Sequence, residues 1–126
     1  MVDVTANQRS RSVVHQRAMQ LSVPEIVGHI QSVLGRELLA LITGKDGRTV
    51  TRWISGPQRP PRAEEKLIRD TFQVLEVLLT VQDPSVVRAW FMGMNPQLDD
   101  QSPAEVLAEG GVRDVMAAAR AFINAS

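Results

Sequence analysis

Residues 36–56 have the sequence RELLALITGKDGRTVTRWISG, and this segment indicates the architecture more clearly than any other part of the chain. Its apolar residues recur at intervals of three and four, which is typical of amphipathic helices and not of strands, where they alternate. Gly44 and Gly56 follow the two periodic runs, and glycine is the usual residue just after a helix. Asp46 is a good N-cap for the second run. The segment therefore predicts two helices of under three turns, joined by a tight turn.

The same segment matches the pattern of a helix-turn-helix. This motif needs a small residue where its two helices cross, a residue that accepts a left-handed turn, and apolar residues that hold the second helix against the core. Ala40, Gly44, Val50 and Trp53 provide these properties at the usual offsets. Lys45 departs from the pattern, because an apolar residue is common at its position. The match predicts a DNA-binding motif.

The outward face of the second helix carries the candidate DNA-binding residues. Helical geometry that turns Val50 and Trp53 toward the core turns the opposite face toward solvent, where it can meet a major groove. The residues predicted for this contact are Arg48, Thr49, Thr51 and Arg52. Arg48 and Arg52 lie one turn apart and are the candidates for guanine edges or phosphates. An ordinary helical hairpin with two solvated arginines is the alternative interpretation.

Helix signals continue on both sides of this segment. Upstream, Ser22 and Glu25 predict a capping box for a helix that ends before Gly35. Downstream, the prolines of residues 56–61 interrupt helix formation, and the longest apolar periodic run follows over residues 62–81. Three more helices are expected: one from Asp83-Pro84 to Gly93, one from Ser102-Pro103 to Gly110-Gly111, and a last one from Val112 onward. The predicted fold class is all-α, with a helix-turn-helix N-terminal half packed on a long central helix and a C-terminal helical subdomain.

Charge divides the chain into a basic and an acidic half. The formal net charge is zero, but residues 1–62 carry nine Lys/Arg against four Asp/Glu, and residues 63–126 carry five against ten. Such a chain can place one end on a polyanion while the other end stays off it. Chance clustering on a solvated surface is the alternative. Arg9, Arg11 and Arg17 could form a basic arm that reaches DNA, but a frayed, soluble terminus is the preferred explanation.

The composition argues against an enzyme, a metal site and a membrane protein. Cysteine is absent and the two histidines, His15 and His29, are too few for most metal sites, so we expect no metal and no cofactor. Asp99-Asp100 is an acidic pair with no histidine near it in sequence, and such pairs are usually solvated surface. The N-terminus lacks the apolar region of a signal peptide, and no apolar run approaches a bilayer span of roughly 20 residues. We therefore expect a cytoplasmic location and no catalytic residues.

The C-terminal half resembles the toxin-binding domain of the Xre/MbcA/ParS antitoxins. The family pattern is a Trp followed by a hydrophobic residue, an Asn-Pro-x-Leu turn, a Ser-Pro-x-x-x-Leu helix start and a Gly-x-x-x-Val helix. These pieces occur in order within residues 90–91, 95–98, 102–107 and 111–115, and residues 51–56 resemble the family's N-terminal region. The likeness extends over about residues 24–123. The motif residues Trp90, Asn95, Pro96, Leu98, Pro103, Leu107 and Val115 are mostly interpreted as determinants of the fold.

The resemblance implies a partner and a division of the chain. The partner is a RES-domain toxin that consumes NAD or uses it to modify proteins, and whose active site the antitoxin's C-terminal domain occludes. The resemblance also implies operator DNA as a ligand, assembly into a homodimer or higher homo-oligomer, and repression of the shared operon. The expected division is a flexible basic arm over residues 1–21, the helix-turn-helix region and linker over 22–61, and the toxin-binding and oligomerisation domain over 62–126.

The candidate residues for toxin contact are Met92, Met94, Arg113, Arg120 and Asn124. Methionines suit an adaptable interface, but Met92 and Met94 could equally fill gaps in the core. Two further hypotheses remain open beside the toxin-neutralising repressor. One is a stand-alone helix-turn-helix regulator that dimerises through its C-terminal half. The other is an adaptor whose basic half has lost DNA binding.

Overall fold

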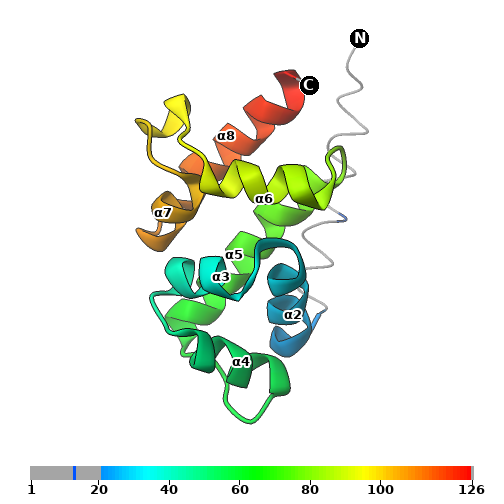
Figure 1. Cartoon of the computed structure of the whole chain (residues 1–126), viewed down its shortest axis with the longest axis vertical. Helices are drawn as coiled ribbons and strands as arrows, with labels where there is room; N and C mark the ends of the chain where they lie inside the picture. The colour runs from blue at the N-terminus through cyan, green and yellow to red at the C-terminus, as the bar shows by residue number, and fades with distance from the viewer. Residues whose placement is uncertain (1–12, 14–20, 126) are drawn as a thin grey trace.

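The computed structural model describes residue 13 and residues 21–125, and every regular element within residues 21–125 is a helix (Figure 1). The predicted all-α class is therefore confirmed. Arg9, Arg11, Arg17 and His15 lie outside the described residues. The elements are α2 (Val23–Leu34), α3 (Arg36–Thr43), α4 (Gly47–Ser55), α5 (Arg62–Leu79), α6 (Pro84–Met92), the 3-10 helix η1 (Pro96–Leu98), α7 (Pro103–Ala108) and α8 (Val112–Ala125).

Side-chain caps begin three of these helices as the sequence predicts. Ser22 accepts a hydrogen bond from the backbone N–H of Glu25 at 3.3 Å, and Asp46 accepts one from the N–H of Thr49 at 2.8 Å. Ser102 does the same for Glu105 at the start of α7, at 3.1 Å. These bonds satisfy donors that the first helical turn leaves without partners.

Two predicted helix ends differ from the structure in detail. Asp83 occupies the N-cap position of α6, but its side chain makes no capping hydrogen bond, so Pro84 at the first helical position is what marks this start. The long helix α5 ends at Leu79 and not at Val81. Its last turn tightens, because the N–H of Val81 donates to the carbonyl of Leu78, three residues back.

A single hydrophobic cluster joins the two halves of the chain. α5 packs against α2, α6 and α8, while α3 packs against α7. The cluster includes Ile30 of α2, Trp53 of α4, Phe72 of α5, Phe91 of α6 and Val115 of α8, all of them buried. The predicted boundary at residue 61 therefore divides the sequence without dividing the core.

The long axis of the molecule separates two candidate surfaces. Figure 1 shows α4 at one end of this axis, the C-terminal half of α8 toward the other, and α5 running between them. A ligand held by α4 and a ligand held by the far end of α8 would therefore contact opposite ends of the molecule.

No single helix of residues 21–125 is both long and apolar enough to cross a bilayer. Only α2 and α3 taken together reach that length and composition, and they are bent by 118° where they meet at Gly35.

Candidate nucleic-acid interface and partner surface

The turn between α3 and α4 has the backbone conformation that the sequence predicts. Gly44 adopts a left-handed conformation with φ of 69°, which glycine accepts at little cost. Its N–H donates to the carbonyl of Leu41, and the N–H of Lys45 donates to the carbonyl of Ala40 at 3.1 Å. Two carbonyls in the last turn of α3 are thus satisfied as the chain reverses toward Asp46, the N-cap of α4. The predicted turn is confirmed at Gly44.

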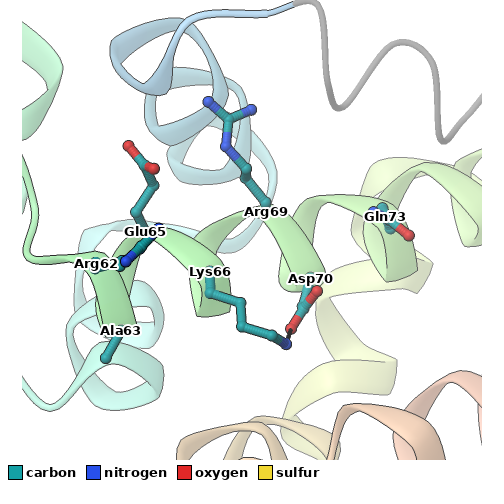
Figure 2. Close-up of a pocket in the computed structure, with 7 residues that line it drawn as sticks. All are labelled: Arg62, Ala63, Glu65, Lys66, Arg69, Asp70 and Gln73. Carbon is teal, nitrogen blue, oxygen red and sulfur yellow. Dashed lines mark hydrogen bonds and ion pairs between the residues drawn. The ribbon is translucent and has the colours of Figure 1, made fainter.

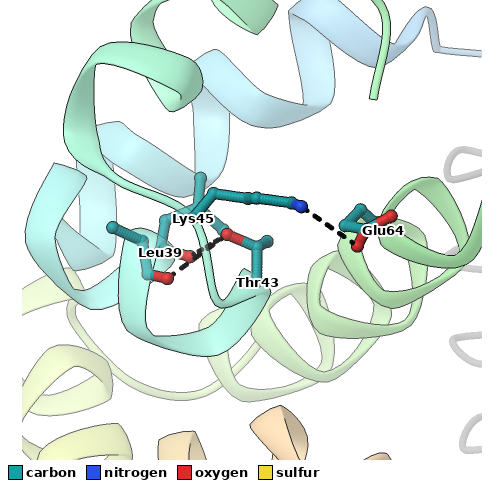
Figure 3. Close-up of polar contacts among 5 residues, drawn as sticks. Leu39, Thr43, Lys45 and Glu64 are labelled. Atoms are coloured by element: carbon teal, nitrogen blue, oxygen red, sulfur yellow. Dashed lines mark hydrogen bonds and ion pairs between the residues drawn. The ribbon is translucent and has the colours of Figure 1, made fainter. Parts of the chain in front are cut away.

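Lys45, which departs from the usual helix-turn-helix pattern, is accommodated by α5. Its ammonium lies 3.7 Å from the Oε1 atom of Glu64, and the side chain extends from the α3–α4 turn toward α5 (Figure 3). Beside it, the hydroxyl of Thr43 donates to the carbonyl of Leu39 at 2.8 Å, so this buried polar group is satisfied within α3. A partly exposed ion pair of this kind stabilises by less than about 1 kcal/mol. Its main consequence is that a charged residue fits where an apolar one is common.

Helix α4 has one buried face and one exposed face, as predicted. Val50 and Trp53 are buried, with Trp53 only 1% exposed. Arg48, Thr51 and Arg52 are exposed, whereas Thr49 is half-buried. The exposed face therefore places two arginines one turn apart at the surface, where they can reach a ligand outside the chain.

The two arginines of α4 are uncompensated. Within residues 21–125, neither Arg48 nor Arg52 has a carboxylate within 4 Å. The carboxyl group of Asp46 has a pKa below its ordinary value, chiefly because it accepts hydrogen bonds from Thr49 and secondarily because the positive charges of Arg48 and Arg52 lie near it. The Asp46 carboxylate near these arginines is thus committed to capping α4, and the face keeps a positive charge.

A second surface rich in basic residues, along the N-terminal half of α5, is different because two of its basic side chains are ion-paired and a third is hydrogen-bonded to the backbone. Lys66 lies 2.7 Å from Asp70, and Arg59 lies 3.1 Å from Glu65. Figure 2 shows Lys66 turned along the helix to Asp70 and Arg69 pointing toward α2, where it donates to the carbonyl of Leu21 at 3.3 Å. The pocket on this face has a volume of about 730 Å³. The acidic partners within this surface make it a poorer polyanion site than the exposed face of α4, where neither arginine is ion-paired.

The candidate toxin-contact residues are mostly at the surface. Met92 is 56% exposed and Met94 is 81% exposed, so the alternative that they fill gaps in the core is wrong. Arg113 and Asn124 are exposed and Arg120 is half-buried. The three α8 residues are spaced by seven and four positions, which places them on one stripe of the helix.

The loop after α6 lies near α8, which brings the two groups of toxin-contact candidates to neighbouring elements. The ring centroids of Trp90 and Phe122 are 6.2 Å apart, and α8 also contacts η1, which begins two residues after Met94. Met92 and Met94 therefore belong to the same part of the surface as α8. They supply exposed apolar atoms, and the neighbouring helix α8 supplies the exposed polar residues Arg113 and Asn124.

The motif residues mostly support the fold, as the sequence indicated. Asn95 accepts a hydrogen bond from the N–H of Gln97 at 2.9 Å and thereby starts η1. Buried motif residues are Leu98, Pro103, Leu107 and Val115. The acidic pair Asp99-Asp100 is exposed, and both residues have positive φ in the turn that follows η1. In the described part of the chain, no three His, Cys, Asp or Glu side chains are grouped as a metal site would require.

The fold matches that of a solved antitoxin complex. One chain of the crystal structure of the M. tuberculosis MbcT–MbcA toxin–antitoxin complex superimposes with a TM-score of 0.72 and 22% sequence identity, over 83% of this chain and 96% of that chain. This likeness establishes the fold, an all-helical architecture found in a toxin–antitoxin complex. No protein-family model matches the chain.

Sequence comparison identifies the family. The chain is 34% identical over 116 residues to a probable mycobacterial cidal antitoxin of Mycobacterium tuberculosis, and the match covers 90% of this chain and 96% of the relative. The chain belongs to the mycobacterial cidal antitoxin family. The predicted resemblance to MbcA-type antitoxins is thereby confirmed.

Proposed function

We propose that this chain is an antitoxin that neutralises a cognate RES-domain, NAD-consuming toxin in the cytoplasm and represses its own operon. Residues 62–126 occlude the toxin's active site and mediate homo-oligomerisation, residues 22–61 bind operator DNA, and residues 1–21 are a basic arm. The chemistry belongs to the toxin, and the chain needs no cofactor of its own. Membership of the antitoxin family, over nearly the whole length of the relative, is the observation that carries the proposal.

DNA binding is supported by the charge of the exposed face of α4. Arg48 and Arg52 project from a helix that a turn of helix-turn-helix geometry holds at one end of the molecule. Unpaired guanidinium groups bind phosphates and guanine edges, often through two parallel hydrogen bonds. Thr51 lies between them on the same exposed face and Thr49 borders it. These four residues are the ones that the sequence predicts for contact with DNA.

DNA binding is tested by titrating the duplex that lies upstream of the chain's own reading frame. The double variant Arg48→Ala, Arg52→Ala should lower the affinity and reduce the slope of log K against log salt by about one to two, because each lost phosphate contact removes close to one unit. Arg113→Ala is the matched control, because it removes an exposed arginine from α8. An unchanged affinity in the double variant, with the fold intact, would rule out this DNA surface.

Toxin binding is supported by the exposed methionines beside α8. Adaptable apolar side chains with a polar surround are typical of protein interfaces. The test is co-expression with a RES-domain protein encoded next to this chain: growth arrest by that protein should be relieved, and the two proteins should co-purify. The double variant Met92→Glu, Met94→Glu should weaken this complex and leave DNA binding unchanged, while Val86→Glu, an exposed apolar residue on α6, is the matched control.

A stand-alone helix-turn-helix regulator is the second candidate function. It is favoured by the same uncompensated arginines on α4, which need no toxin to act. The two candidates differ in what the acidic half contacts. Failure to form a stable complex with any neighbouring RES-domain protein, together with specific binding to the upstream duplex, would leave the regulator as the function.

A further inference from the structure

Arg36, the first residue of α3, places its side chain on α4. A Cβ atom at Gly47 would lie 2.8 Å from Nε of Arg36 and 3.2 Å from both its Cδ and its Cζ atoms. The Nη1 atom of Arg36 is also 3.5 Å from Oγ1 of Thr51, one turn further along α4. The guanidinium therefore crosses from one helix of the motif to the other and rests over the first turn of α4, in space that Gly47 leaves open.

The protein leaves most of the hydrogen-bonding capacity of this guanidinium unused. Arg36 is exposed, and no carboxylate within residues 21–125 lies within 4 Å of it. Its neighbour Thr51 is neutral, and the Thr51 hydroxyl already donates to the carbonyl of Gly47 at 3.0 Å. A guanidinium has five N–H donors in a planar fork, and this geometry matches the oxygens of a phosphate. The side chain is thus placed against α4 while most of its donors have no partner in the described part of the chain.

The local charge favours the α4 side of Arg36. On its other side, Arg36 lines a pocket of about 360 Å³ at the α2–α3 corner together with Arg88 and Glu37. The carboxylate of Glu37 offsets part of the positive charge there. On the α4 side the charged residues are Arg48, Arg52 and Asp46. The Asp46 carboxylate accepts a hydrogen bond from Thr49, and neither arginine has an ion pair in the described part of the chain, so two positive charges stand against one negative charge. An anion is therefore better accommodated over α4 than in the pocket.

We propose that Arg36 is a third arginine of the α3–α4 surface, that it binds a phosphate of the DNA backbone, and that Gly47 is the residue that lets it do so. The inference rests on the DNA binding proposed above and names a contact that the helix pattern of α4 does not reveal. Phosphate contacts position a protein on DNA without reading its sequence. Arg36 therefore contributes equally to specific and non-specific duplexes.

The experiment measures binding of the full chain to its upstream duplex and to a scrambled duplex of the same length, over a series of salt concentrations. Arg36→Ala should weaken binding to both duplexes about tenfold and lower the salt slope by about one. Gly47→Ala should weaken binding in the same direction, because its Cβ displaces the guanidinium without removing the charge. Its thermal stability should not fall, since alanine is a good helix residue and a flexible arginine can move aside. Arg88→Ala on α6 is the control, because it removes an exposed arginine from the pocket side of Arg36.

Three results would overturn the proposal. In the first, Arg36→Ala binds DNA as tightly as the wild type while the Arg48→Ala, Arg52→Ala double variant binds weakly. This result would show that Arg36 does not contact DNA, and the proposed DNA binding by α4 would stand. In the second, Arg36→Ala and the Arg48→Ala, Arg52→Ala double variant both bind DNA as tightly as the wild type, which would refute the proposed DNA binding itself. A loss confined to the upstream duplex would show that Arg36 reads bases and does not bind phosphate.

Discussion

Trp53 lies beneath the exposed arginines of α4, and its substitution by alanine or phenylalanine separates two contributions to stability. The residue is 1% exposed, and its indole N–H is buried with no hydrogen-bond acceptor among the described residues. Trp53→Ala leaves a cavity and should cost about 3 to 5 kcal/mol, a large part of the roughly 5 to 15 kcal/mol that stabilises a domain. We therefore expect this variant to be partly unfolded near physiological temperature.

Trp53→Phe should behave very differently. It loses part of the buried ring but also removes a buried donor without an acceptor, and these effects oppose each other at about 1 to 3 kcal/mol each. The expected net change is within about 1.5 kcal/mol. The assay is urea unfolding followed by far-ultraviolet circular dichroism, with DNA titration of the same samples, in which Trp53→Phe should bind like the wild type. Trp90→Phe, at a half-buried tryptophan in contact with Phe122, is the matched control. If Trp53→Phe loses as much stability as Trp53→Ala, the reasoning about the indole N–H is refuted.

Three further predictions concern the helix starts and the shared core. Ser22→Ala should cost about 1 kcal/mol in thermal unfolding because it removes the cap of α2, whereas Ser22→Asp should retain the cap; equal stability of all three proteins would contradict this. The folded-state pKa of Asp46 is lowered, so its stabilisation is present above the ordinary value of 3.8 and is lost as the pH falls through the lowered value. The free energy of unfolding of the wild type and of Asp46→Asn should be measured in urea at a series of pH values. As the pH falls below that ordinary value, the wild type should lose stability relative to Asp46→Asn, and an equal pH dependence of the two proteins would refute the assignment. Phe91→Ala should cost about 3 to 5 kcal/mol and accelerate hydrogen exchange in α4 as well as in α8, because both share one core; unchanged exchange in α4 would show that the halves unfold separately.

The helix boundaries of residues 22–56 could be predicted because short-range interactions set them. The starts of α2 and α4 depend on a side chain that bonds a backbone N–H three residues away, as Ser22 and Asp46 do, whereas α3 begins after Gly35 without a side-chain cap. The ends at Gly44 and Gly56 depend on the backbone freedom of a single glycine. The inward direction of Val50 and Trp53 follows from helical periodicity alone, so the exposed face of α4 was also predictable.

The exposure of Met92 and Met94 could not be predicted, because a methionine at a helix end suits the core and the surface equally. The ion pair of Lys45 with α5 was unpredictable for another reason: it depends on where α5 passes the α3–α4 turn.

Amino-acid order alone was sufficient for the helices, their caps, the turn at Gly44 and the family resemblance, because these depend on neighbours within a few positions. The place of Arg36 required the folded chain. It contacts Thr51, fifteen positions away, only because α3 and α4 pack at an angle that brings Gly47 beneath the guanidinium. The basic and acidic halves of the chain likewise share one core because helices that are distant in the chain pack against each other. Hydrophobic burial has no direction, so a periodic pattern shows which face is buried and leaves open which helix covers it.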